Sequence, residues 1–84
     1  MTFNFFDTGG HGYLQVSKEQ FLQSGADKRK ISTYSGLTQT FLYLEEDCDA
    51  TYFLNHLREN GISYELNEVY QPVTVTHNYN PNNF

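Results

Sequence analysis

Several residue types are scarce in this chain of 84 residues, which has no tryptophan, two prolines and a single cysteine, Cys48. One cysteine excludes an intramolecular disulfide and any zinc site built from several cysteines, and it favours a reduced protein of the cytoplasm. No apolar run approaches the roughly 20 residues that a membrane span needs. The first residues also lack the basic start and apolar core of a signal peptide. We therefore expect a cytoplasmic protein with no membrane contact.

Basic side chains are also few, and charge is unevenly distributed along the chain. Residues 1–44 carry four basic and three acidic side chains, whereas residues 45–84 carry one basic and seven acidic side chains. An acidic half repels nucleic acid and attracts basic protein surfaces. The basic run 28–30 supplies at most about three phosphate contacts, which is a weak grip at physiological salt. The sequence predicts no direct binding of nucleic acid.

Aromatic residues are abundant by contrast, with seven Phe and seven Tyr. A chain of this length builds one core, and each buried ring removes about 150–250 Å² from water. Fourteen rings exceed what such a core holds, so several tyrosines should lie at the surface or in an interface. We expect a single domain over residues 1–76, followed by a flexible Asn-rich tail, residues 77–84.

Capping and turn residues define the predicted elements. Ser17 with Gln20 forms a capping box for a first helix that ends at Gly25, and Asp47 caps a second helix that ends at Gly61. The predicted helices are 18–24 and 48–60, and the predicted strands are 2–6, 13–16, 31–34, 40–44 and 62–67, with a further edge strand at 73–75.

These elements predict an α+β fold, a mostly antiparallel sheet of five strands with both helices on one face. Residues 2–6 and 13–16 should form a hairpin, and residues 40–44 should be central in the sheet. From Tyr13 onward the order is β-α-β-β-α-β, which is typical of the ferredoxin-like fold, here with an extra N-terminal strand.

The acidic turn Glu45-Glu46-Asp47-Cys48-Asp49 has three interpretations. It is a helix cap that also complements the helix dipole, a docking surface for a basic partner, or a cation site. The turn lacks the alternating ligands, central glycine and distal glutamate of an EF-hand loop. The cap is the simplest of the three interpretations, and we predict no metal.

The loop Gly9-Gly10-His11-Gly12 precedes a strand and is most simply a hairpin connection. A functional interpretation is also open, in which backbone N–H groups cradle an anion and His11 acts as base or ligand. The loop does not match a nucleotide-binding motif, because its glycines do not open a helix. His11, His56 and His77 show no metal-ligand spacing. The start of the predicted helix and the neighbouring carboxylates have opposite effects on the reactivity of the Cys48 thiol. We predict neither a cofactor nor an enzyme.

Two motifs carry a resemblance to a known group of proteins. The pattern D-x-G-x-H-G-Y-L-x-V begins at Asp7, and Y-L-E-E-D-C-D-A begins at Tyr43, with Ser32-Thr33-Tyr34-Ser35 between them. The chain resembles small uncharacterised proteins of bacteria, phages and plasmids, although that group often has Asp-Pro-Gly where this chain has Asp7-Thr8-Gly9. The resemblance implies a phage or mobile-element setting and no catalytic residues.

The sequence predicts a small acidic binding protein that docks on a basic surface of a host protein, as a monomer or weak homodimer. Its sharpest form is an inhibitor of a CRISPR or restriction nuclease. Two alternatives remain, a small ligand- or metal-binding domain or enzyme built on the loop Gly9–Gly12, and self-association through exposed tyrosines and an edge strand. The predicted partner-binding residues are Tyr43, Glu45, Glu46, Asp47, Asp49, Glu65 and Glu68.

Overall fold

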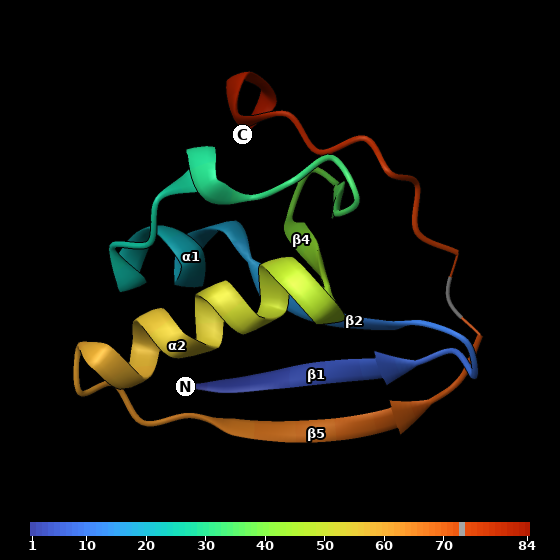
Figure 1. The fold of residues 1–84 in the computed structure, drawn as a ribbon, viewed down its shortest axis with the longest axis horizontal. Coiled ribbons are helices and arrows are strands. Elements are labelled where there is room, and N and C mark those ends of the chain that lie inside the picture. The colour runs from blue at the N-terminus through green and yellow to red at the C-terminus, as the bar shows by residue number, and fades with distance from the viewer. Residues whose placement is uncertain (73) are drawn as a thin grey trace.

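The computed structural model describes residues 1–72 and 74–84. As predicted, the fold is α+β, with a five-stranded mixed sheet and two helices (Figure 1). The strands are β1 (Thr2–Asp7), β2 (Gly12–Ser17), β3 (Gly36–Leu37), β4 (Phe41–Glu45) and β5 (Glu65–Tyr70), and the helices are α1 (Lys18–Ser24) and α2 (Thr51–Glu59).

The strand order is β3-β4-β2-β1-β5, so β2 is the middle strand and β4 lies beside it. β1 and β2 form the predicted hairpin. The pairs β1–β2, β2–β4 and β3–β4 are antiparallel, and β5 runs parallel to β1. The order β-α-β-β-α-β holds from β2 to β5. The insertion of β1 between β2 and β5, and the two-residue β3, depart from a plain ferredoxin-like sheet.

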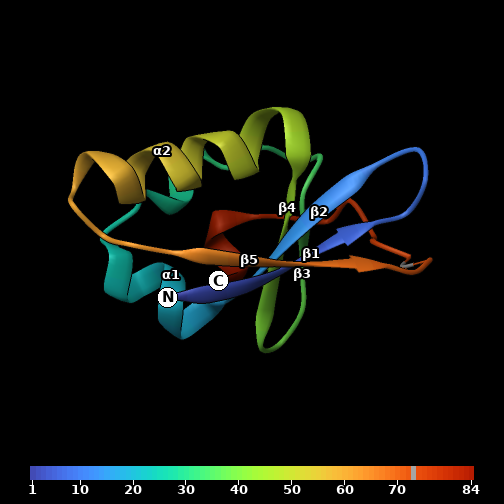
Figure 2. The same cartoon turned by 90° about the horizontal axis from the view of Figure 1, so that it is seen from below.

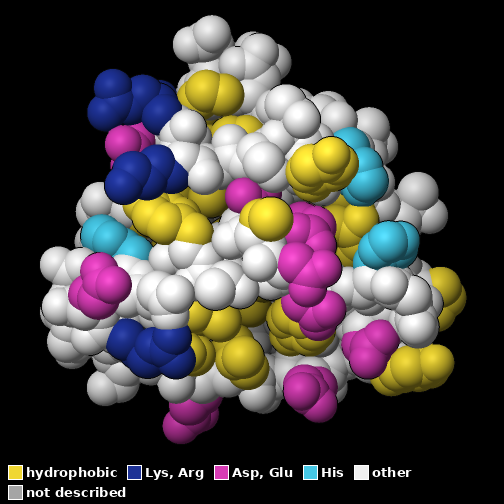
Figure 3. All heavy atoms as spheres, viewed as in Figure 1, with side chains coloured by type: hydrophobic (Ala, Val, Ile, Leu, Met, Phe, Trp, Pro, Cys, Tyr) yellow, Lys and Arg dark blue, Asp and Glu magenta, His cyan; other side chains and the backbone are white. Residues whose placement is uncertain are grey.

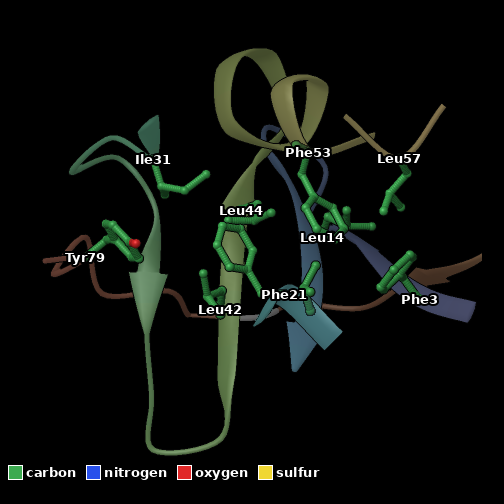
Figure 4. Close-up of a cluster of buried hydrophobic side chains, with 11 residues drawn as sticks. Phe3, Leu14, Phe21, Ile31, Leu42, Leu44, Phe53, Leu57 and Tyr79 are labelled. Carbon is green, nitrogen blue, oxygen red and sulfur yellow. The ribbon is translucent and has the colours of Figure 1, made fainter. Parts of the chain in front are cut away.

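One face of the sheet carries the hydrophobic core, as Figure 4 shows. Leu14 lies opposite Leu44 and Val16 opposite Leu42, so alternate residues of β2 and β4 point to this face. Both helices add to the same core, because the ring of Phe21 in α1 stacks on that of Phe53 in α2, with centroids 5.5 Å apart. Phe21 of α1 and Phe53 and Leu57 of α2 are thereby buried in one core.

Polar and aromatic side chains occupy the other face of the sheet. Asn4, Gln15 and Tyr43 lie in one row across β1, β2 and β4. The Asn4 amide donates to the Gln15 side-chain oxygen at 3.3 Å, and the Gln15 amide donates to the Tyr43 hydroxyl at 3.0 Å. All three side chains are half-buried. α2 packs on the opposite face of the sheet, where Phe53 and Leu57 join the core, and Figure 2 shows this helix on one side of the strands.

The predicted helix signals for α1 are present in the structure. Ser17 accepts from the backbone of Gln20, and the Gln20 side chain accepts from the backbone of Ser17, so the capping box is complete. Gly25 closes the helix in the left-handed conformation, with φ of 75°. Within residues 1–72 and 74–84, no helix is long and apolar enough to cross a membrane.

Two predicted strands are corrected by the structure. Residues 31–34 form a turn rather than a strand, because the N–H groups of Ser32 and Tyr34 donate to side-chain oxygens of Asp49 and Ser32 instead of joining a ladder. The last strand begins at Glu65 rather than at residue 62. The N–H of Ile62 closes α2 on the Leu57 carbonyl at 2.9 Å, so Ile62 belongs to the helix end.

The C-terminal segment, expected to be a flexible tail after residue 76, packs on the domain. Tyr79 is buried, donates its hydroxyl to the Lys28 carbonyl at 2.6 Å, and bonds through its N–H to the Ser35 carbonyl at 3.1 Å. The Phe84 ring lies 5.5 Å from that of Phe21. Figure 1 shows this segment in red beside the chain that precedes β3. Residue 76 is therefore not a domain boundary.

The predicted edge strand at 73–75 falls partly outside the described residues, because Val73 is not among them. Residues 74–76 do not form a strand. Val75 and Thr76 lie so close over Gly36 that a Cβ atom there would be 2.6 Å from Val75 Cγ1 and 2.7 Å from the Thr76 carbonyl oxygen. The C-terminal segment thus crosses over β3.

Candidate functional site: an acidic and aromatic pocket

The acidic turn begins where β4 ends, and its cap differs from the predicted one. Glu45, not Asp47, caps the turn: its carboxylate accepts from the N–H of Asp47 at 3.1 Å and of Cys48 at 3.2 Å. The backbone of Glu45 is still extended, and a single π-helical turn, Glu46–Ala50, leads into α2. The helical structure therefore starts before Asp47, which leaves the Asp47 side chain exposed and free of a capping role.

Asp49 does not belong to the exposed acidic surface, contrary to the prediction. Only 2% of this residue is exposed. Its carboxylate accepts from the N–H and hydroxyl of Ser32, at 3.0 and 2.7 Å, and from the hydroxyl of Ser35. A buried carboxylate needs such partners, and these three donors supply them. Asp49 therefore connects the acidic turn to residues 32–35 instead of contacting a partner.

A pocket opens beside the acidic turn, with a volume of about 230 Å³. It gathers segments that are far apart in sequence: the loop before β2, the turn before β3, the end of β4 and the C-terminal segment. In Figure 3 a column of acidic side chains lies beside hydrophobic and histidine side chains, while lysine and arginine side chains lie apart on the left. The pocket is lined by His11, Tyr13, Tyr34, Glu45, Asp47, Cys48 and His77.

Three rings form the wall of the pocket. The Tyr13 hydroxyl and His77 Nε2 are hydrogen-bonded at 2.9 Å, and their ring centroids are 6.3 Å apart. The Tyr34 ring meets His77 edge-on at 6.4 Å. Tyr13 is buried, whereas 62% of Tyr34 is exposed. Burial and the nearby negative charge of Glu45 both raise the pKa of the Tyr13 phenol, which is consistent with a negative potential in the pocket.

His11 reaches the pocket from the glycine loop, which is a tight turn between β1 and β2. The Thr8 N–H and hydroxyl both donate to the His11 carbonyl at 2.9 Å. Two of the loop's own N–H groups are engaged internally, Gly9 with the Asp7 carboxylate and His11 with the Thr8 hydroxyl. An anion cradle needs free N–H groups, so this geometry favours the connecting turn over the phosphate-binding interpretation.

The remaining predicted partner-binding residues lie away from the pocket. Glu65 and Glu68 are exposed on β5, and two strands separate β5 from β4. The three strand spacings from β4 to β5 correspond to a distance of about 14 Å. Tyr43 lies one row further along β4 from Glu45, on the face opposite the core. The structure therefore brings together Glu45, Glu46 and Asp47, and it places Glu65 and Glu68 at a different edge.

Side chains of types that can take part in catalysis line the pocket, among them His11, Cys48 and His77. Within the described ranges, no group of three or more His, Cys, Asp or Glu side chains could hold a metal ion. Cys48 is exposed, and among these same residues its thiol makes no hydrogen bond with His11 or His77, as an activated nucleophile would. Carboxylates beside aromatic faces are instead a chemistry suited to binding cationic groups.

Sequence reasoning did not assign Tyr13, Tyr34 or His77 to a site. The sequence predicts Tyr13 as a strand residue, and in the structure it pairs with Glu45 in the β2–β4 register, which is how the two sequence motifs meet. The signal that the sequence offers is that both motifs lie at the ends of predicted strands. His77 gave no signal, since its place depends on the packing of the C-terminal segment.

Comparison of the chain with protein family models, with curated proteins and with solved structures found no match. Functional inference therefore starts from the pocket and the acidic side chains beside it.

Proposed function

We propose that this protein is a small binding protein that docks on a basic surface of a partner protein. Docking uses the acidic ridge, which we define as Glu45, Glu46 and Asp47. The observation that carries the proposal is the lack of internal neutralisation. Among residues 1–72 and 74–84 the one ion pair joins Arg29 and Asp27, at 3.1 Å, so no basic side chain of the chain pairs with the ridge.

The ridge is also held in place before a partner arrives. Glu45 is fixed by its two bonds to the turn, and its own N–H donates to Ser35 at 3.0 Å. Glu46 and Asp47 follow on the same turn and are exposed. A fixed backbone loses less conformational entropy on binding, and clustered negative charge speeds encounter with a basic surface.

In its sharper form, the partner surface is one that ordinarily binds the phosphates of nucleic acid. Carboxylates of the ridge would occupy positions meant for phosphates, and the protein would act as an inhibitor of a host nuclease, such as a CRISPR or restriction enzyme. One observation supports this form, the excess of acidic side chains after residue 44. The phage or mobile-element setting that the sequence resemblance implies is part of this proposal.

A pull-down from bacterial lysate with matched charge variants tests the docking. The first variant combines Glu46→Lys and Asp47→Lys in the ridge, and the control combines Glu65→Lys and Glu68→Lys on β5. Both change the net charge equally. We expect the wild type and the β5 variant to retain the same basic protein, eluted at moderate salt, and the ridge variant to lose it. Equal retention by both variants would contradict docking through the ridge.

A further inference from the structure

We propose that the pocket beside the acidic ridge is a receptor for the guanidinium group of an arginine side chain that the partner protein inserts. This inference rests on the proposed function and deepens it, because it names the residue type that anchors the complex. Arginine is enriched among the few residues that carry most of the binding energy at interfaces.

The size of the pocket fits a single side chain. Its volume of about 230 Å³ lies below the range of roughly 300–1,000 Å³ that is usual for sites of drug-sized ligands. Asp47 and Cys48 line the pocket and are exposed, so a side chain from a docked protein can enter it directly. Size and access together favour a protruding residue of the partner over a free metabolite.

The walls of the pocket are suited to a flat cation. Tyr13, Tyr34 and His77 present rings around one space, with the centroid of His77 6.3 Å from that of Tyr13 and 6.4 Å from that of Tyr34. The planar guanidinium group stacks on aromatic faces and is more weakly hydrated than an ammonium group. Tyr34 has most of its surface exposed in the free protein, and a stacked guanidinium would cover it.

Two carboxylates complete the receptor. A carboxylate has about four acceptor positions, and Glu45 uses two of them for the N–H groups of Asp47 and Cys48. The carboxylate of Asp47 has no hydrogen-bond donor among the residues that the structure describes. Acceptor capacity therefore remains on both side chains. Arginine carries five N–H donors in a fixed fork, which can engage two carboxylates at once, whereas lysine offers a point charge.

Titration of the ¹⁵N-labelled protein of 84 residues with N-acetyl-arginine-N′-methylamide tests the receptor without any partner. The matched control ligand is the citrulline analogue, which has the same shape and no charge. We expect saturable amide shifts confined to the pocket, with a dissociation constant in the millimolar range, about −4 kcal/mol or weaker. The citrulline analogue should bind at least about tenfold more weakly, and the lysine analogue about fivefold more weakly.

Variants make the result specific to the pocket. Tyr34→Ala and Asp47→Asn should each weaken arginine binding by about threefold or more. Glu68→Gln on β5 should leave it unchanged, since Glu68 lies outside the pocket. The spectrum of each variant also reports directly whether it is folded.

Three results would overturn the receptor: no saturable shift with the arginine analogue, equal binding of citrulline or lysine, or unchanged binding by Tyr34→Ala. Failure here is distinguishable from failure of the docking proposal. If the pull-down still depends on the ridge, docking stands and the receptor is wrong. If arginine binds as expected but no protein is retained in a ridge-dependent way, the pocket binds guanidinium groups, but docking through the ridge and insertion of a partner's arginine are both wrong.

Discussion

The buried carboxylate of Asp49 accepts a hydrogen bond from the hydroxyl of Ser35, and this contact joins the acidic turn to the segment before β3. The Ser35 oxygen also accepts the N–H of Glu45 at 3.0 Å. Ser35 is therefore hydrogen-bonded to both ends of the acidic turn, to Glu45 at its start and to Asp49 at its end. Because Tyr34 precedes Ser35, the pair also sets the distance between the aromatic wall of the pocket and the ridge. One buried charge thus positions the candidate site.

Asp49→Asn tests this link. The amide keeps the volume but presents a donor where the carboxylate accepts three bonds, so we expect a loss of about 1–3 kcal/mol in the free energy of unfolding. Urea denaturation followed by circular dichroism measures it. Asp47→Asn, at an exposed position of the same turn, should stay within about 0.5 kcal/mol of wild type. Equal effects of the two substitutions would show that the buried bonds contribute little.

Gly12→Ala should destabilise the hairpin for a steric reason. A Cβ atom at Gly12 would be 2.4 Å from a carbon of the Phe5 ring and 2.6 Å from a carboxylate oxygen of Glu46. The Phe5 ring belongs to the packed face, so we expect a cost of about 1–3 kcal/mol.

Gly10→Ala is the matched control, because nothing lies within 4 Å of a Cβ atom there. We expect this variant to unfold at the wild-type temperature or slightly above it, since alanine restricts the unfolded chain. A thermal melt of both variants settles the comparison. If both melted alike, the close approach of Phe5 to Gly12 would not matter for stability.

Local signals in the sequence were sufficient for the elements that depend on neighbouring residues. The capping box at Ser17 and the glycine stop at Gly25 each involve residues within about one turn of helix, and both signals are present in the structure. Residues 31–34 show the limit of such signals. Their β-prone composition predicts a strand, but the side chain of Asp49, distant in sequence, takes the backbone N–H of Ser32.

The candidate site was less predictable than the fold for the same reason. Glu45 and Asp47 could be recognised as acidic residues of a turn, whereas Asp49, two residues further on, is buried. No periodicity distinguishes a carboxylate that faces solvent from one that faces Ser35. The aromatic wall depends on His77 and Tyr13, which are 64 residues apart, and an Asn-rich composition suggested disorder for the segment that carries His77.

Tyr79→Ala tests whether the C-terminal segment is part of the domain. Tyr79 is buried in the core cluster, and truncating a buried aromatic side chain typically costs about 3–5 kcal/mol. We expect a loss near that size in urea denaturation, and an increased rate of proteolytic cleavage after residue 76. Asn82→Ala, at an exposed position of the same segment, should change neither measurement. A Tyr79→Ala protein as stable as wild type would restore the interpretation of a free tail.

Tyr79→Phe addresses alkaline stability. Burial, together with the charges of Asp49 and Asp27, raises the pKa of the Tyr79 phenol to about 12. The phenol of the unfolded chain ionises near pH 10. Below pH 10 the phenol is neutral in both states, and its contribution to the stability of the folded state is fully present. Between pH 10 and pH 12 the phenol ionises in the unfolded chain but not in the folded protein, so this contribution is lost as the pH rises toward 12. Each pKa unit corresponds to about 1.4 kcal/mol, which makes the full loss about 2–3 kcal/mol.

Phenylalanine removes the hydrogen bond to the Lys28 carbonyl, so at pH 7 we expect the variant to be about 1 kcal/mol less stable than wild type. As the pH rises from 10 to 12 the wild type should lose stability faster, and the difference between the two proteins should shrink and then reverse. Urea denaturation at a series of pH values measures this. Tyr70→Phe, where the ring is 79% exposed, serves as the control and should track the wild type throughout. A constant difference between Tyr79→Phe and wild type up to pH 12 would mean that the phenol ionises as easily in the folded protein as in the unfolded chain.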